Sequence, residues 1–299
     1  MAYFPQVGAN GMTVQLPFGQ TFSHLTSVSE LQSGPRQSYA WRPNPLLAWD
    51  LTYPALTPAE YATLLSFFQS QQGRYGEFTF LDPGGNLVLA SENFADASWQ
   101  QFSVAVGASV AGPFSGSLGT TITGTTNGML ATVVLPSGNG AGLWLCGSVY
   151  VLAPAASMLV IGFIDSGFNV LASQSCALPA NQWTRIACSI QLATNSSIRL
   201  LIGGIGSWTG PLSLFGAQVA PMGGPGAYQR TPGNYGLHSK TRFDTDLLEP
   251  QYVGPAQISL KLRLALHPIA AAFCSSASKS ARRSRQARAC PLPASTSKM

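Results

Sequence analysis

The chain has 299 residues, of which only 9% are charged, while glycine and proline number 31 and 21. Globular chains typically carry about 25% charged residues, so this composition disfavours helical bundles and favours short strands joined by many turns. The formal charge of +5 arises beyond residue 270, because residues 1–269 hold 10 basic and 11 acidic side chains, a net −1. A body without excess positive charge excludes nucleic-acid binding by that part.

Targeting, membrane and metal motifs are missing from the sequence. The N-terminal MAYFPQVGANG has no basic stretch followed by an apolar core, so we expect no secretion signal. No apolar run reaches the ~18 residues of a membrane span. The five cysteines show no CxxC spacing, which indicates buried or incidental thiols in a reducing cytoplasm. A bridge between Cys176 and Cys188, on neighbouring predicted strands, is the alternative.

Residues 1–56 have the pattern of strands and turns. In AWDLTY, residues 48–53, the side chains of Trp49, Leu51 and Tyr53 alternate onto one face, as in a half-buried strand. The proline-rich WRPNPLL before it suits an edge or a turn.

One helix is predicted near residues 58–72. Thr57 and Glu60 form a capping box and Pro58 takes the first helical position. An apolar stripe follows at helical spacing, and Gly73 suits the left-handed stop. The stripe consists of Tyr61, Leu64, Leu65 and Phe68.

After the helix, FTFLDPGG predicts a strand with Phe78 and Phe80 on one face, ending in a turn at residues 82–85. Short apolar runs separated by turns then recur from residue 87 to 234: GLWLCGSVYVLA, SMLVIGFID, WTRIACSIQL, SIRLLIGGI and LSLFGAQV. Many short strands with frequent turns favour a sandwich or jelly roll. This segment has only six charged side chains: Glu92, Asp96, Asp165, Arg185, Arg199 and Arg230.

Residues 236–266 again contain an ordinary proportion of charged side chains. They end in a predicted strand in which apolar and polar side chains alternate. In QISLKLRLAL, Lys261 and Arg263 face away from a row of apolar side chains. That row consists of Ile258, Leu260, Leu262, Leu264 and Leu266.

Residues 267–299 contain no acid and few large apolar side chains, which predicts a disordered basic tail. Three interpretations stay open for it: a chain end without a role, an arm for nucleic acid or an acidic partner, and a frame-altered end.

Two blocks resemble one known family. WDLTYPALTPAEYATLLSFFQSQQGRYGEFTFLDPGGN is similar to the small minor tail proteins of long-tailed bacteriophages and prophages. GLHSKTRFDTDLLEPQYVGPAQISLKLRLAL is similar to the strands by which that family's chain returns. The resemblance implies a tail-tip protein that docks on other tail proteins and forms a homo-oligomer of trimeric or hexameric symmetry.

The segment between these blocks resembles a second family. ASENFADASWQQFSVAV, GSVYVLAP, NQWTRIACSIQL and LFGAQVAPMGGPGAYQRTPG occur in the order found in jelly-roll modules of phage tail and carbohydrate-active proteins. This resemblance implies a carbohydrate-binding-like module.

We therefore expect a mainly β protein in which a jelly roll interrupts a small tail-protein domain. The predicted parts are residues 1–86 plus 235–266 as the split domain, 87–234 as the insert and 267–299 as the tail. Loop tips tolerate such insertions when the ends of the inserted module lie close together. The helix should then pack on a sheet built from both flanks.

Motifs for catalysis are scarce. The sequence has no GxSxG, no HExxH and no P-loop. The insert offers only Glu92, Asp96 and Asp165 for the carboxylate pair that glycoside cleavage needs. We therefore expect no enzymatic activity.

Glycan binding is the more specific hypothesis, because aromatic rings stack on sugars while amides and hydroxyls satisfy their OH groups. Trp208 in the glycine-rich GGIGSWTGP is the leading candidate, with a plug over the sandwich edge as the alternative role. Trp144 and Trp183 could equally be core residues, since each belongs to a predicted strand. The remaining candidates are Trp99, Tyr228, Asn127 and Asn139.

Two smaller charged groups are further candidates. Glu92 and Asp96 are the potential ligands of a structural calcium ion, which needs several oxygen donors. Arg242, Asp244 and Asp246 form a cluster that could serve a subunit contact or lie solvated in a turn.

Together these patterns predict a structural component of a phage or prophage tail tip, assembled in the bacterial cytoplasm, whose insert binds a host cell-surface polysaccharide. The alternatives are a polysaccharide-degrading enzyme with its centre in the jelly roll, and a decorative scaffold without a ligand.

Overall fold

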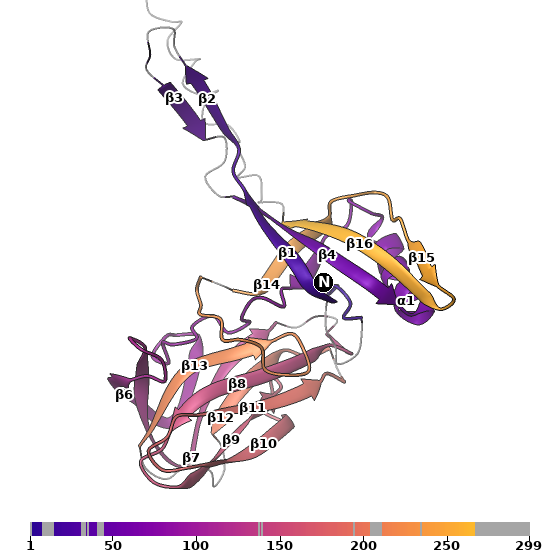
Figure 1. Cartoon of the computed structure of the whole chain (residues 1–299). Coiled ribbons are helices and arrows are strands. Elements are labelled where there is room, and N and C mark those ends of the chain that lie inside the picture. The colour runs from indigo at the N-terminus through magenta and orange to yellow at the C-terminus, as the bar shows by residue number, and fades with distance from the viewer. Residues whose placement is uncertain are drawn as a thin grey trace, which may run out of the picture. The chain divides into compact units, whose positions relative to one another are not determined.

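A computed structural model describes residues 2–7, 15–30, 34, 36–40, 45–136, 138, 140–193, 195–203, 211–233 and 235–266. The described residues form 16 strands, β1 to β16, and one helix, α1. Figure 1 shows the strands gathered in two main sheets. The predicted mainly β fold with one helix is therefore confirmed, whereas the predicted disordered tail, 267–299, lies outside the described residues.

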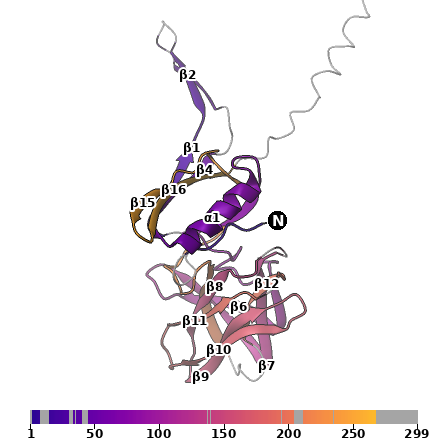
Figure 2. The ribbon, with the colours of Figure 1, turned by 90° about the vertical axis from the view of Figure 1, so that its right-hand side faces the viewer.

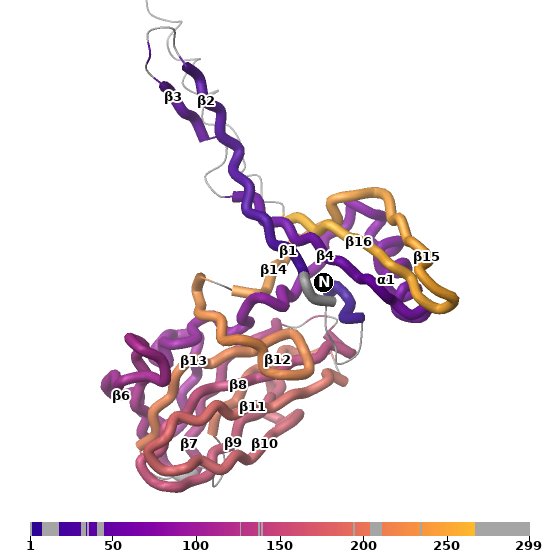
Figure 3. The backbone as a smooth tube through the Cα atoms, in the orientation of Figure 1, coloured from indigo at the N-terminus to yellow at the C-terminus, as the bar shows by residue number. Residues whose placement is uncertain are grey.

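The first sheet takes its strands from both ends of the chain. Its order is β1 (Gln15–Ser23), β4 (Leu46–Leu56), β16 (Gln257–Leu266), β14 (Leu237–Phe243) and β5 (Phe78–Leu81), with β15 (Gln251–Gly254) paired to β16. The backbone tube of Figure 3 shows β4 and β16 side by side, although some 200 residues separate them in sequence. We call this the flanking sheet.

The flanking sheet buries the apolar faces that alternation predicts. Leu264 lies opposite Trp49 in the antiparallel register, and Leu262 lies opposite Leu51. All four side chains are buried in one core. The predicted faces of the strands around AWDLTY and QISLKLRLAL are both confirmed.

Helix α1 (Pro58–Gln71) covers this core, as Figure 2 shows. The capping box is present: the Glu60 N–H donates to Thr57 Oγ1 (3.3 Å), and the Thr57 N–H donates to Glu60 Oε2 (2.7 Å). Two details differ from the prediction. Gly73 has the predicted left-handed conformation, with φ 61°, but Gln72 is left-handed as well, with φ 54°, and is the C-cap. Phe67 replaces Leu65 among the stripe residues packed on the core, because the stripe drifts around the helix surface.

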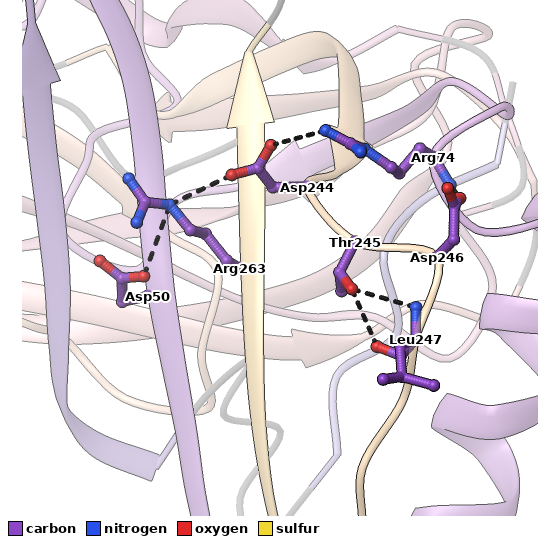
Figure 4. A network of polar contacts seen from close by, with 7 residues as sticks. All are labelled: Asp50, Arg74, Asp244, Thr245, Asp246, Leu247 and Arg263. Carbon is purple, nitrogen blue, oxygen red and sulfur yellow. Dashed lines mark hydrogen bonds and ion pairs between the residues drawn. The ribbon is translucent and has the colours of Figure 1, made fainter.

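The opposite face of the flanking sheet carries a chain of ion pairs (Figure 4). Asp244 pairs with Arg263 (3.3 Å) and Arg74 (3.7 Å), and Arg263 also pairs with Asp50 (3.7 Å). The predicted cluster of Arg242 with Asp244 and Asp246 does not form. Arg242 pairs instead with Glu77 (2.7 Å), and Asp246 Oδ1 accepts the backbone N–H of Arg74 (2.9 Å).

The second sheet folds over into a β-sandwich. Its order is β10 (Val170–Leu178), β9 (Ser157–Ile164), β12 (Ile198–Gly203), β7 (Leu118–Leu135), β13 (Leu212–Ala220), β8 (Trp144–Leu152) and β11 (Thr184–Gln191), with β6 (Trp99–Ala111) beside β7. The long strand β7 joins the layers, because residues 129–135 pair with β12 and residues 120–122 with β13. The two layers enclose a single apolar core, as the predicted jelly roll requires.

The connections between the flanking sheet and the sandwich lie side by side. The Asp82 N–H donates to Gly236 O (2.8 Å), and the Gly236 N–H donates to Asn86 O (2.9 Å). The ends of the sandwich segment are thus close together, as an insertion needs. Residues 1–267 form one compact unit, so the division into a split domain and an insert stays a prediction.

A hairpin of β2 (Thr26–Glu30) and β3 (Arg36–Ala40) is a feature that the sequence did not single out. Its ten strand residues are all exposed.

The thiols Cys146, Cys176 and Cys188 are free. The alternative Cys176–Cys188 bridge is therefore not formed. Burial raises the pKa of the Cys188 thiol to about 11, so it is protonated at neutral pH.

Candidate functional site

The predicted aromatic candidates have different environments. Trp208 and Asn139 lie outside the described residues. Trp144 and Trp183 are half-buried, and Asn127 is exposed on β7. The backbone of Trp144 is fixed by Gln6, whose side chain accepts the Trp144 N–H (2.6 Å) and donates to Trp144 O (3.1 Å).

Trp99 is a core residue. It is 4% exposed and packs against Phe94 with ring centroids 5.1 Å apart. Its indole N–H donates to Ala90 O at 2.8 Å. An indole whose two faces are both buried cannot stack on a sugar, so Trp99 does not contact a ligand. Its role is to hold the segment before β6 against the sandwich.

That segment forms one wall of a hollow of about 500 Å³. The other walls come from β6, β7 and the segment that follows β13. Leu89 and Leu118 line it and are 48% and 62% exposed. Its polar lining includes Glu92, Asn93, Asp96, Ser109, Thr120 and Arg230. Three of the six charged side chains of residues 87–234 therefore line one hollow.

Glu92 is held on both carboxylate oxygens. Its Oε2 pairs with Arg230 Nε at 3.0 Å, and its Oε1 accepts the Tyr228 hydroxyl at 3.0 Å. Burial raises the pKa of Tyr228, so the phenol keeps its proton and donates it to Glu92. Because a phenol has one hydrogen, the Ser91 hydroxyl, 2.9 Å away, donates to the Tyr228 oxygen.

Tyr228 is positioned by a glycine. Gly216 has φ 63°, and a β-carbon at that position would lie 3.0 Å from the Tyr228 ring. Only glycine accepts this backbone geometry together with such a close neighbour. The ring then packs on Phe215 with centroids 5.4 Å apart.

Asp96 lines the same hollow. Its Oδ1 accepts the Ser98 N–H at 2.8 Å, and this backbone hydrogen bond lowers the pKa of Asp96. The carboxylate is thus ionised at neutral pH and acts only as a hydrogen-bond acceptor.

The pair Glu92 and Asp96 does not fit calcium. Calcium takes 6–8 oxygen ligands, whereas both Glu92 oxygens already accept hydrogen bonds or ion pairs. Within the described ranges, no three acidic, histidine or cysteine side chains are grouped to hold a metal ion. The lowered pKa of Asp96 also does not suit the general acid of glycoside cleavage, which must have a raised pKa.

A row of four rings extends from Tyr228 across the outer face of strands β13 and β8. After Tyr228 come Phe215 and then Tyr150, whose ring centroids are 6.1 Å apart. Phe114 lies beside both, with its centroid 5.8 Å from that of Phe215 and 5.4 Å from that of Tyr150. We call Phe114, Tyr150, Phe215 and Tyr228 the aromatic row. Arg185 lies over the Tyr150 ring at 5.4 Å.

The structure thus brings together Tyr228, Glu92 and Asp96, which the sequence suggested for two different purposes. Sequence reasoning missed Arg230, Asn93 and the rest of the aromatic row. A usable signal existed for Tyr150: in SVYV the two valines are buried, so Tyr150 must face outward. No local signal pairs Arg230 with Glu92, because 138 positions separate them.

Comparisons with known proteins give no sequence match: no family model and no curated protein matches the chain. Solved structures resemble about half of it. The enzymatically active domain of a bacteriophage CBA120 tailspike protein is 15% identical over 47% of this chain and 22% of its own, with a TM-score of 0.36. The chain thus spans less than a quarter of that protein.

Two carbohydrate-binding modules of family 22 are similar as well. That of Clostridium thermocellum Xyn10B is 13% identical over 48% of this chain and 97% of its own, with a TM-score of 0.38. The xylan-binding domain of Paenibacillus barcinonensis Xyn10C is 16% identical over 48% and 99%, with a TM-score of 0.36.

Among the described residues, no helix is both long and apolar enough to cross a membrane.

Proposed function

We propose that this protein is a structural component of a phage or prophage tail tip whose sandwich binds a saccharide of the host surface. The observation that carries the binding part is the hollow: it gathers half of the charged side chains of a segment that otherwise has almost none. Charge placed in one concave site is typical of ligand binding, since a few polar groups in a pocket set ligand orientation.

The chemistry of the hollow suits sugars. Asp96, Asn93 and the hydroxyls of Ser109 and Thr120 supply acceptors and donors for sugar OH groups, and the exposed leucines supply apolar contact for C–H groups. Glu92 is already fixed by two partners, so little side-chain entropy is lost when a ligand binds. A volume near 500 Å³ falls in the usual range of about 300–1,000 Å³ for small-molecule sites.

The tail-tip part of the proposal is supported by the flanking sheet. Apart from β1, its strands come from the two blocks that resemble minor tail proteins, and strands of the two blocks pair directly with one another. Immunogold labelling of particles released after prophage induction tests this part. We expect label at the tail tip, whereas particles without label, with the protein left in the lysate, would contradict it.

Binding is tested with the full chain on an array of bacterial capsular and O-antigen polysaccharides. We expect binding by the natural protein, a loss of about tenfold in Asn93→Ala, corresponding to about 1.4 kcal/mol, and no loss in Asn127→Ala. The two asparagines are both exposed, but only Asn93 lines the hollow. A folded protein that binds nothing, or equal losses in both variants, would contradict a saccharide site in the hollow.

A further inference from the structure

Arg185 on β11 is a cation whose protein partners are all neutral. Its Nη2 donates to Ser148 Oγ (2.9 Å) and to Gln218 Oε1 (3.5 Å), and its guanidinium lies over the Tyr150 ring (5.4 Å). Its Nε is buried and has no acceptor among the described residues. The charge is therefore held in place but not neutralised.

The other two arginines of the sandwich each lie near an acid, although the Nε of Arg199 is also buried without an acceptor among the described residues. Arg230 pairs with Glu92 at 3.0 Å. Arg199 also lies over a ring, that of Phe168 (4.8 Å), but Asp165 is near enough that Arg199 helps to lower the pKa of Asp165, after the stronger effects of Asn169. Within the described part of the chain, Arg185 makes no ion pair with any acid. A half-buried cation without a counter-charge is unfavourable unless another anion neutralises it.

The surroundings of Arg185 are suited to a sugar. Arg185, Tyr150 and Phe215 lie directly opposite one another on three neighbouring strands. Phe114 packs edge-to-face against Tyr150 and Phe215 and is 49% exposed. At the other end of the row Tyr228 packs on Phe215, and its hydroxyl reaches Glu92 in the hollow. The aromatic row and the hollow are therefore linked through one side chain.

We propose that Arg185 and the aromatic row form a second subsite of the same glycan-binding surface, and that it selects a saccharide bearing an anionic group, either a carboxylate or a sulfate. This inference rests on the proposed glycan-binding function. An anionic oxygen beside Arg185 forms a charge-assisted hydrogen bond, roughly twice as strong as a neutral one. The rings of Phe114 and Tyr150 cover the C–H face of the same sugar.

The test uses the full chain and matched pairs of polysaccharides. Each acidic capsular or O-antigen polysaccharide is presented in its native form and after carboxyl reduction, and each sulfated polysaccharide before and after desulfation. The two arms separate a carboxylate ligand from a sulfate ligand. The variants are Arg185→Gln, Arg185→Lys and, as the matched control, Arg199→Gln, each checked for folding by circular dichroism.

We expect the natural chain to bind native acidic members at least about tenfold more tightly than their neutral counterparts. Arg185→Gln should abolish that preference, Arg185→Lys should keep part of it because the charge remains, and Arg199→Gln should keep all of it. Equal binding to acidic and neutral members, or a preference that Arg185→Gln retains, overturns the inference and leaves glycan binding intact. Binding to no polysaccharide by the natural chain overturns both.

Discussion

The flanking sheet and the sandwich use charge in opposite ways. The flanking sheet places its charges on its solvent face, where Asp50, Arg263, Asp244 and Arg74 neutralise one another in a chain of pairs (Figure 4). The sandwich has only six charged side chains, and three of them line a single hollow. Paired charges on an exposed face need no ligand to explain them, whereas scarce charges gathered in a concavity do. On this contrast we place the proposed binding function in the sandwich.

The two regions should also differ in how they respond to a core deletion. Phe163 is fully buried in the sandwich core, so Phe163→Ala should destabilise the sandwich by about 3–5 kcal/mol through lost burial and a cavity. If the sandwich is an inserted module, calorimetry should show one transition moved to lower temperature and the transition of the flanking sheet unchanged. One cooperative transition that moves as a whole would show that the predicted domain division is wrong.

The connection between the regions contains a titratable pair that should make stability depend on pH. The His238 imidazole lies against Trp49, with centroids 4.7 Å apart, and 4.0 Å from Asp82, which also accepts the Trp49 indole N–H. Burial lowers the pKa of His238, and this effect outweighs the opposite effect of Asp82.

The ordinary pKa of a histidine is about 6.5. Below that pH the unfolded chain therefore binds more protons than the folded chain. Stability is full above that pH and is lost as pH falls toward the folded pKa, by up to about 1.4 kcal/mol per pH unit. Thermal melts between pH 8 and 5 measure the slope. His238→Gln should flatten it, and an unchanged slope in that variant would assign the dependence to other groups.

Removing one atom, the hydroxyl oxygen of Tyr228, should break the link between the aromatic row and the hollow. Tyr228→Phe removes the hydroxyl that contacts Ser91 and Glu92 but keeps the ring on Phe215. We expect a loss of about 1 kcal/mol in unfolding free energy, together with weaker glycan binding, because Glu92 loses one of its two anchors. Urea melts and array binding measure the two effects. Unchanged binding would show that the orientation of Glu92 does not matter to the ligand.

The smallest effect is expected on the solvent face of the flanking sheet. Asp244→Asn breaks ion pairs with Arg263 and Arg74, and exposed pairs contribute about 0–1 kcal/mol. Glycan binding should stay the same, and added salt should reduce the stability difference. A large loss of binding in this variant would contradict the contrast between the two regions.

Most of the fold could be predicted because its signals are local. Alternation in AWDLTY and QISLKLRLAL specifies which side chains are buried, and the capping box of Thr57 and Glu60 marks where α1 begins. The exchange of Leu65 for Phe67 in the helix stripe could not be predicted, because it depends on how α1 rests on the sheet.

The candidate site was predictable only in part. Tyr228, Glu92 and Asp96 were each singled out, but for stacking and for calcium, and Trp99 was kept as a ligand candidate although it lies in the core. The hollow arises from a contact between segments some 136 positions apart, Glu92 with Tyr228. Such long-range pairing leaves no periodicity in the sequence. Trp208, the leading candidate, lies outside the described residues.

The central claim, a saccharide site in the hollow, is tested most directly by one affinity ratio. Asp96 and Asp165 are matched carboxylates, since each accepts a backbone N–H two residues ahead at 2.8 Å, but only Asp96 lines the hollow. The dissociation constant of the best array glycan is measured for Asp96→Asn and for Asp165→Asn. We predict at least about tenfold weaker binding for Asp96→Asn and an unchanged constant for Asp165→Asn. Equal constants in the two variants would contradict the account.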